Sequence, residues 1–405
     1  ATLTHEGEAA DAKATGDAIS AVKARQNIIV GSEIGNPISV DDAFPAPLCG
    51  LTVYGKSTQS GTPTPDAPVP IVSAGDGGSL TVKVTGKNRM PPNLKCGDVL
   101  ECFVKKNTPI TLVFKGDLVS QGGNILFFDE NNNKKWFGID AGKAEHHITY
   151  PVDVTKFQYL LANMASENVC LTWNASSPDY EPYREQLLTL PTPTGLPGIP
   201  VTSGGNYTDS TGQQWVCDEV DLERGVRVQR IASFVINAEN ADNFFVTNDF
   251  TAITVAANAR LATPQKTKRD DRQYGRCVFC EALPWKINAW ASPVNAIGFI
   301  EDNSVDLTIE NSYLGLSEAS TNAERKTALV KYFTDNPCHV VYRIATPIEN
   351  PLTPAEIAAY KAFVTYGPDT VVQAGDGAGI RLEYQRDVNI VVKNLEDAIA
   401  SMTTT

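Results

Sequence analysis

The feature that most constrains the fold is how often glycine and proline interrupt short stretches of alternating apolar and polar residues. The chain has 30 glycines and 25 prolines among its 405 residues. Residues 73–78 read Ser-Ala-Gly-Asp-Gly-Gly and lead into Leu80–Val84, where apolar and polar residues alternate. Glycine supplies the positive φ angles of tight turns, and a period of two is typical of a strand with one buried face. The sequence therefore predicts a mainly β protein, with a β-hairpin at this position.

Two later segments resemble this turn-and-strand unit. Glycines 204–205 precede the strand-like run Gln214–Val220, and Ala374–Gly379 leads into Ile380–Tyr384. Three related units, each about one domain length from the next, suggest a β scaffold into which larger modules are inserted. We expect scaffold at residues 31–87, which include a proline-rich segment, and again at residues 186–230.

Two longer stretches predict the inserted modules. Residues 88–185 hold short strands at a spacing of roughly 8 to 12 residues with turn signals between them, which is the pattern of a β-sandwich. Residues 231–345 show the same pattern, and Thr321 to Glu324 form a capping-box sequence that predicts one helix there. The expected fold is mainly β, with two jelly-roll-like β-sandwich modules in a β scaffold.

Both ends of the chain carry apolar residues at helical spacing. Residues 1–30 are expected to be a helical connector, and residues 346–405 a helix, a hairpin and a terminal helix. Short amphipathic helices need a partner to be stable, so the pattern predicts oligomerisation, with a frayed single helix as the alternative. The candidate oligomerisation residues are Ile19, Val22, Ile29, Val392, Leu395 and Ile399.

Composition and charge exclude several classes of function. The net charge of −13 argues against a nucleic-acid partner, because phosphate binding needs a concentrated basic face. No apolar run approaches the roughly 20 residues that span a bilayer, so membrane insertion is not expected. The chain has eight cysteines, expected to be mostly reduced core residues.

The sequence offers no pattern from which a metal site or catalytic residues can be assigned. Cys277 and Cys280 have the spacing of a zinc pair, but the second pair that zinc needs is missing. Carboxylate pairs for glycoside hydrolysis meet only in space, and 47 acidic residues make any choice arbitrary. We therefore expect a protein without a cofactor that is not an enzyme.

Aromatic side chains in the first module are the remaining candidates for binding. A sugar's C–H face stacks on an exposed ring, and polar neighbours bind its hydroxyls. Trp136, beside the polar loop at 129–135, and Tyr180 and Tyr183, near the exit of the module, are the candidate ligand-binding residues. Packing in the core is the alternative for each of them.

A resemblance adds what composition does not provide. Residues 51–71 (LTVYGKSTQSGTPTPDAPVPI) resemble a signature segment of minor structural and tail proteins of phages and prophages of Gram-positive bacteria. Later parts of the same family are similar to residues 180–183, 196–221, 224–225, 341–347 and 352–357. Residues 9–18 are similar to the helical connector of tail-fibre and baseplate subunits.

The resemblance implies a virion component that is made in the host cytoplasm and is commonly a homotrimer. It implies attachment to other virion proteins through the N-terminus, and modules similar to carbohydrate-binding modules that contact host cell-surface glycans. No catalytic residues carry over from the family. A head fibre or capsid decoration protein and a glycan-degrading tail enzyme are the alternatives.

Overall fold

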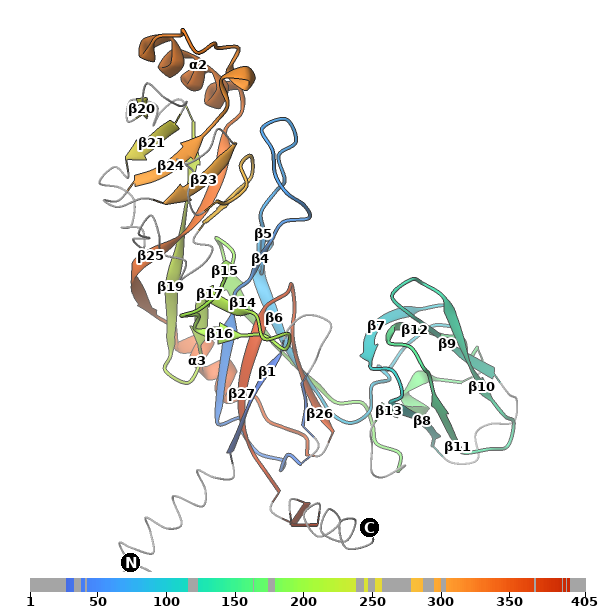
Figure 1. Cartoon of the computed structure of the whole chain (residues 1–405). Helices are drawn as coiled ribbons and strands as arrows, with labels where there is room; N and C mark the ends of the chain where they lie inside the picture. Colours follow the sequence, from blue (N-terminus) through green and yellow to red (C-terminus); the bar gives the residue numbers. More distant parts are fainter. Residues whose placement is uncertain are drawn as a thin grey trace, which may run out of the picture.

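The structure is a computed structural model, and it describes residues 27–32, 38–40, 42–115, 123–162, 164–173, 179–237, 244–246, 252–256, 278–286, 295–299, 304–367, 369–387, 389–390 and 392–393. The protein is mainly β, as the turn pattern predicts. Figure 1 shows a central scaffold from which two β-rich lobes extend in different directions. The first lobe contains seven strands between residues 99 and 173, and the second contains a four-stranded sheet between residues 244 and 308 and a helix at residues 322–335.

Two antiparallel sheets enclose the core of the scaffold. The larger has the strand order β1 (Asn27–Ser32), β27 (Gly379–Gln385), β3 (Gly50–Tyr54), β18 (Glu219–Asp221), β19 (Val226–Ile236), β25 (Cys338–Pro351) and β22 (Val278–Cys280). The smaller has the order β14 (Glu185–Thr192), β6 (Gly78–Thr85), β26 (Thr370–Ala374) and β2 (Ile38–Val40). Alternate apolar side chains of both sheets, such as Val53 and Val82, form one buried cluster.

The first lobe is inserted between two strands that pair directly. β6 and β14 are antiparallel neighbours in which Thr85 lies opposite Glu185, and the whole lobe leaves and returns at this point. Its two sheets share one core. Their strand orders are β10 (Lys134–Ile139), β9 (Gly123–Phe128), β12 (Val154–Tyr159), β7 (Val99–Val104), and β11 (Glu145–Thr149), β8 (Pro109–Phe114), β13 (Val169–Trp173).

The second lobe is inserted in the same way between β19 and β25. These strands pair from Val226 and Pro351 to Ile236 and Cys338, with a bulge between Gln229 and Ile231. The lobe adds a four-stranded sheet of the order β20 (Phe244–Val246), β21 (Ala252–Ala256), β24 (Ser304–Thr308), β23 (Ala296–Phe299). It packs with α2 (Asn322–Asp335) onto the outer ends of β19, β22 and β25. We predicted a separate sandwich at residues 231–345. In the structure, strands β19, β22 and β25 of the larger scaffold sheet form one of the two layers of this lobe.

The capping box at Thr321–Glu324 starts a helix, as predicted, and the same sequence pattern at Thr353–Glu356 starts the helix expected after residue 346. The Thr321 hydroxyl accepts the backbone N–H of Glu324 at the start of α2, and the Thr353 hydroxyl accepts that of Glu356 at the start of α3 (Pro354–Lys361). Each Glu carboxylate accepts the backbone N–H of its cap in return. These signals are local, so the sequence is sufficient to predict them.

Two of the predicted hairpins are wrong. The turn at 73–78 joins β5 (Val72–Ser73), which pairs with β4 (Ser57–Thr58), to β6 in the smaller scaffold sheet. The turn at 374–379 likewise passes the chain from β26 to β27, which lie in different sheets. The glycine pattern indicates a tight turn in both places, but the strands on either side find their partners elsewhere in the chain.

The helical prediction for the N-terminus is wrong at Ile29. Ile29 lies in β1, opposite Glu383 of β27. The β-branched run Ile28–Val30 favours a strand, and β27 offers it an edge to pair with. Ile19, Val22, Leu395 and Ile399 lie outside the described residues. Val392 is helical and 46% exposed.

The proline-rich segment at 59–71 connects the scaffold to the second lobe. The side-chain amide of Gln59 donates to the carbonyl of Cys280, and the backbone N–H of Val69 donates to the carbonyl of Glu281. The Tyr332 hydroxyl of α2 donates to the carbonyl of Pro65 at 3.2 Å. Proline restricts the backbone before folding, so this segment forms its contacts at a low entropic cost.

Candidate functional site

The first lobe displays a tryptophan on the outer face of its four-stranded sheet. Trp136 is 57% exposed, while its neighbours Phe137 and Ile139 point into the core, as the period of a strand requires. The strand registers place Trp136, Leu126, Gln158 and Val99 in one row across the sheet. We call this row and its neighbour, formed by Lys134, Phe128, Lys156 and Glu101, the outer face.

The outer face combines an aromatic platform with mixed charge. Val99 is 50% exposed, whereas Leu126 is buried although it lies between Trp136 and Gln158. Two lysines and one glutamate in the second row supply hydrogen-bond donors and acceptors. An exposed ring with polar groups beside it suits the apolar face and the hydroxyls of a pyranose ring.

The other two predicted aromatic residues do not join Trp136. The Tyr180 hydroxyl donates to the carbonyl of Glu167, and the Tyr183 hydroxyl donates to the carboxylate of Glu185. Burial and the Glu185 carboxylate raise the pKa of Tyr183. Both tyrosines are half-buried in the segment that returns to β14, so they help to position the lobe and leave Trp136 as the exposed ring.

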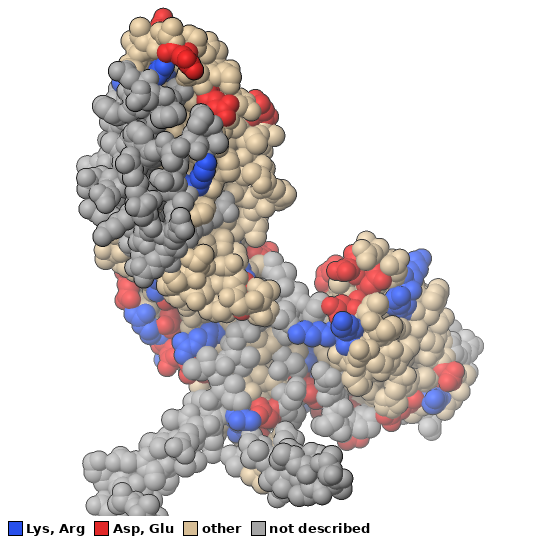
Figure 2. Space-filling view, viewed as in Figure 1, with Lys and Arg blue, Asp and Glu red and all other residues tan. Residues whose placement is uncertain are grey.

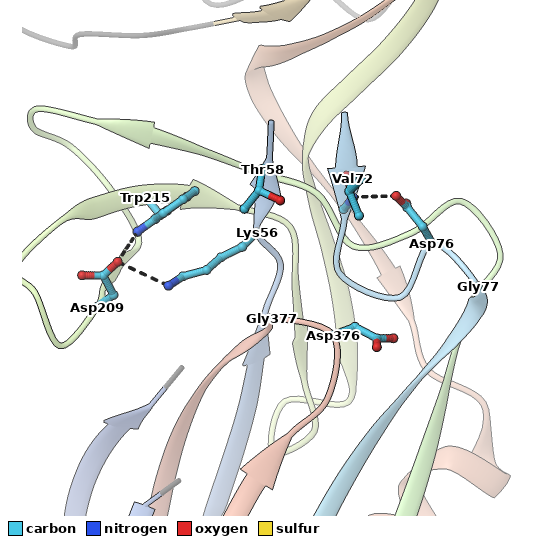
Figure 3. Close-up of a pocket in the computed structure, with 10 residues that line it drawn as sticks. Lys56, Thr58, Val72, Asp76, Gly77, Asp209, Trp215, Asp376 and Gly377 are labelled. Atoms are coloured by element: carbon cyan, nitrogen blue, oxygen red, sulfur yellow. Dashed lines mark hydrogen bonds and ion pairs between the residues drawn. The ribbon is translucent and has the colours of Figure 1, made fainter. Parts of the chain in front are cut away.

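A pocket in the scaffold lies where the three glycine-turn units meet, a site that sequence reasoning did not find. Its volume is 710 Å³, within the range of roughly 300–1,000 Å³ that is typical of small-molecule sites. We call it the scaffold pocket (Figure 3). It is lined by Lys56, Thr58, Val72, Ser73, Asp76, Gly77, Asp209, Trp215, Asp376 and Gly377.

One wall of the scaffold pocket is a buried ion pair held against aromatic rings. The Lys56 Nζ lies 3.3 Å from Asp209 Oδ2, and both side chains are less than 10% exposed. The same carboxylate oxygen accepts the indole N–H of Trp215 at 2.7 Å. Lys56 Nζ also lies 4.8 Å from the centre of the Trp215 ring and 5.5 Å from that of Tyr207. The Asp209, Lys56 and Trp215 side chains therefore hold one another in place.

Local hydrogen bonds keep Asp209 ionised. Its Oδ1 accepts the backbone N–H groups of Thr211 and Gln213, each at 3.0 Å, and the Thr211 hydroxyl. Burial opposes ionisation, but the hydrogen bonds from Thr211 and Trp215 and the charge of Lys56 outweigh it. Together they lower the pKa of Asp209 to about 2. The carboxylate is fully used by the protein, and it acts as a fixed part of the wall.

Close packing attaches the hairpin that carries Tyr207, Asp209 and Trp215 to the scaffold. Tyr207 of β16 (Tyr207–Thr208) stacks on Tyr54 of β3 with ring centres 4.7 Å apart. A Cβ at Gly379 would lie 2.4 Å from the Tyr207 ring, so only glycine fits at this position of β27. β16 pairs with β17 (Gln214–Cys217), which also pairs with β15 (Gly198–Val201).

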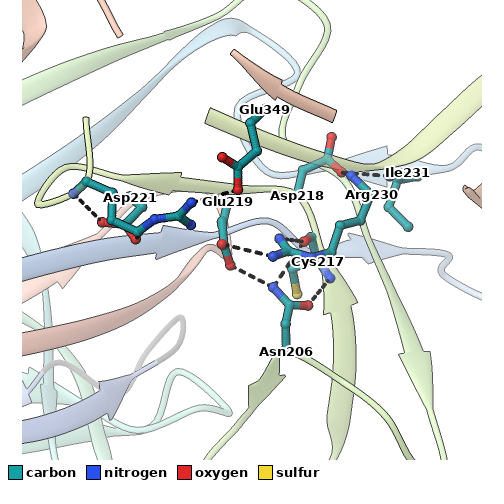
Figure 4. A network of polar contacts seen from close by, with 9 residues as sticks. Asn206, Cys217, Asp218, Glu219, Asp221, Arg230, Ile231 and Glu349 are labelled. Atoms are coloured by element: carbon teal, nitrogen blue, oxygen red, sulfur yellow. Dashed lines mark hydrogen bonds and ion pairs between the residues drawn. The ribbon is translucent and has the colours of Figure 1, made fainter. Parts of the chain in front are cut away.

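A polar network behind β17 joins the hairpin to the larger sheet (Figure 4). The Asn206 side-chain amide donates to the carbonyl of Cys217 and to the Glu219 carboxylate, and its oxygen accepts the backbone N–H of Cys217. The Arg230 guanidinium also donates to the Cys217 carbonyl and to Glu219. Asp218 Oδ1 accepts the backbone N–H groups of Arg230 at 2.6 Å and Ile231 at 2.8 Å, at the bulge of β19. Burial raises the pKa of Asp218 to about 7.

The described residues do not assemble a metal centre. No group of three or more His, Cys, Asp or Glu among them lies in an arrangement that would hold a metal ion. Cys277 lies outside the described part, and Cys280 is buried with its Sγ 3.2 Å from that of Cys338. The raised pKa of Asp218 belongs to a side chain that supports a bulge, and Asp209 is held ionised by five donors.

None of the helices in the described part of the chain is long and apolar enough to cross a membrane.

Searches for related proteins do not identify a family. A scan against protein-family models finds no match, and neither do searches of the curated proteins and of the solved structures.

Proposed function

We propose that the chain is a structural subunit of a virion appendage, of the tail-fibre or baseplate type, which attaches a phage to glycans on its host. The observation that carries the proposal is the exposed Trp136 ring in the outer face of a lobe that projects from the scaffold. The first lobe then acts as a β-sandwich of the jelly-roll, carbohydrate-binding type.

The charge distribution on the first lobe supports a largely uncharged ligand. Figure 2 shows wide uncharged areas on this lobe, with residues of both signs beside them. A neutral saccharide gains from ring stacking and hydrogen bonds and needs no concentrated charge. The net charge of −13 disfavours binding to anionic surfaces through charge alone.

The arrangement of the strands supports attachment of the scaffold at one end. β1 begins at Asn27 opposite Gln385, near the end of β27, so the first residue of β1 and the last residue of β27 lie side by side at one end of the scaffold. Val392, a few residues after β27, is apolar and exposed. We propose that residues 1–26 and 388–405 join three copies of the chain and anchor them to other virion proteins, which leaves the lobes free to contact the host.

Replacement of the exposed ring tests the proposal. Labelled protein is titrated with purified cell-wall polysaccharides of Gram-positive bacteria, and Trp136→Ala is compared with Phe44→Ala. Phe44 is an aromatic residue of the scaffold that is 46% exposed. Loss of a stacked ring removes about 0.5–1.5 kcal/mol beyond its area burial, so we expect the affinity of Trp136→Ala to fall by about 2- to 13-fold from this term alone.

Phe44→Ala should bind like the wild type. Equal binding by Trp136→Ala would contradict the role of the outer face, and absence of binding by the wild type to every polysaccharide would contradict host attachment. Light scattering of the full chain tests the trimer separately, because a monomer at micromolar concentration is incompatible with it.

A further inference from the structure

We propose that the scaffold pocket is a second binding site, which takes a sugar unit with a free amino group. The site lies on the scaffold and its lining includes no residue of the first lobe, so it does not depend on Trp136. It extends the proposed glycan attachment by naming a chemical class of ligand. The inference rests on the wall of the pocket, on the charge inside it and on its size.

The wall is built more rigidly than the fold alone requires. Desolvation of the Lys56–Asp209 pair costs free energy that the attraction between the charges does not reliably repay, so buried pairs are weak evidence for stability. Strand pairing and the Tyr54–Tyr207 stack already hold the hairpin. The pair instead fixes the Trp215 ring at the edge of the pocket, as a preorganised site requires.

The charge inside the pocket favours a cation. Lys56 compensates Asp209, which leaves the carboxylates of Asp76 and Asp376 to set the charge of the site. Both are exposed, and neither forms an ion pair within the part of the chain that the structure describes. They lie on turns from opposite ends of the sequence that meet at this pocket (Figure 3).

The turns present these two carboxylates in defined positions. Asp76 Oδ2 accepts the backbone N–H of Ser73 at 2.5 Å, which orients the carboxylate. Asp376 has a φ of 49° and Gly377 a φ of 83°, the left-handed pair typical of a type I′ turn. An ammonium group donates up to three hydrogen bonds to such acceptors, and charge-assisted bonds are the stronger kind.

The remaining lining fits the body of a sugar ring. Val72 is 57% exposed, and with the Trp215 edge it offers apolar surface for the C–H groups of a pyranose. The hydroxyls of Thr58 and Ser73 lie at the same opening. A cavity of 710 Å³ has the size expected for a short saccharide rather than for a contact with another protein. Two acidic acceptors beside an apolar patch therefore select an amino sugar over a neutral or anionic one.

Paired ligands that differ only at the amino group test the proposal. The full chain is titrated by calorimetry with the glucosamine trisaccharide, with its N-acetylated counterpart and with a neutral glucose trisaccharide. We expect the glucosamine trisaccharide to bind tightest, and more weakly as salt is raised, because ions screen exposed charges.

Asp376→Asn is the informative variant. Asparagine tolerates the left-handed conformation as well as aspartate does, so the turn is preserved while the charge is removed. Binding of the glucosamine trisaccharide should fall roughly 5- to 10-fold. Asp140→Asn makes the same charge change on an exposed residue of the first lobe and should leave this binding unchanged.

The two proposals fail in different ways. Equal affinity for the amino and N-acetylated trisaccharides, or unchanged binding by Asp376→Asn, would overturn the pocket proposal. Loss of glucosamine binding in Trp136→Ala alone would also overturn it, because the ligand would then lie on the outer face. Unchanged glucosamine binding in Asp376→Asn together with loss of polysaccharide binding in Trp136→Ala would leave the proposed function standing without the pocket.

Discussion

Replacement of Asp218 by asparagine is expected to change how the stability of the scaffold depends on pH. Asp218 is 8% exposed, and its Oδ1 accepts two backbone N–H groups at the bulge of β19. Arg230, whose charge favours the ionised form of Asp218, donates its guanidinium N–H groups to Glu219 and to the carbonyl of Cys217. Burial therefore dominates and raises the pKa of Asp218 to about 7.

The sign and the size of the effect follow from the difference in pKa between the two states. The unfolded pKa is 3.8 and the folded one about 7, so the folded state holds the proton more tightly. The stabilisation is complete below pH 3.8 and is lost as the pH rises toward 7, after which the curve is flat. Because one pKa unit corresponds to 1.36 kcal/mol, the difference between 3.8 and about 7 amounts to about 4 kcal/mol.

Asparagine has nearly the same shape and keeps an oxygen that can accept both N–H groups, but it does not titrate. We expect the unfolding free energy of the wild type, relative to Asp218→Asn, to fall by about 4 kcal/mol between pH 4 and pH 7.5. Thermal unfolding of both proteins across this range measures the difference, at about 2–4 °C per kcal/mol for a domain of 150–250 residues. A constant difference between the two proteins at every pH would refute the reasoning.

Two further predictions concern the wall of the scaffold pocket. Gly379→Ala places a Cβ 2.4 Å from the Tyr207 ring and should destabilise the chain by about 1–3 kcal/mol, measured by urea unfolding. Gly138→Ala is the control, because a Cβ there meets nothing within 4 Å, and it should leave the stability unchanged. Equal stability of the two variants would contradict the described packing at Gly379. Asp209→Asn leaves Lys56 buried without its charge partner and should cost about 3–5 kcal/mol at pH 7. Because the folded pKa of Asp209 is lowered from 3.8 to about 2, this cost should shrink by about 2 kcal/mol as the pH falls through that interval, and a cost independent of pH would contradict it.

The elements that could be predicted from the sequence are those with local causes. The helix after Thr321 is specified by a capping box within four residues, and the turn at Asp376 by the glycine beside it. Strand partners have no such signal. β6 finds β14 about one hundred residues later, and pairing over that distance is decided by which faces bury apolar surface together.

The same distinction separates the two candidate sites. Trp136 could be proposed as a ligand-binding residue from the sequence, because it and the polar loop at 129–135 lie within one hairpin. The scaffold pocket could not, because Lys56 and its partner Asp209 are 153 residues apart. One signal was present: the dipeptide Asp-Gly occurs in the same glycine-rich context at Asp76 and at Asp376. It indicated related turns, and only the fold shows that these turns face one pocket.

The two lobes differ in how firmly the scaffold holds them. The second lobe shares strands β19 and β25 with the scaffold, is bridged by the proline-rich segment, and has a common apolar cluster that includes Ile71 and Phe279. The first lobe returns to the strand next to the one it left, and its junction depends on a few polar contacts. Arg89 donates to the carbonyls of Gly86 and Asp369, and its guanidinium lies 5.2 Å from the centre of the Trp173 ring.

A lobe held in this way can change its surface sequence without disturbing the scaffold. Thr85 and Glu185 stay opposite each other whatever lies between them, and the lobe has its own core. The outer face with Trp136 belongs to this exchangeable part, whereas the scaffold pocket is built from strands and turns that the fold itself requires. Under the proposed function, variation in host preference is therefore expected to concentrate on the outer face. A ligand of the proposed pocket site would then be common to chains that share the scaffold but carry different lobes.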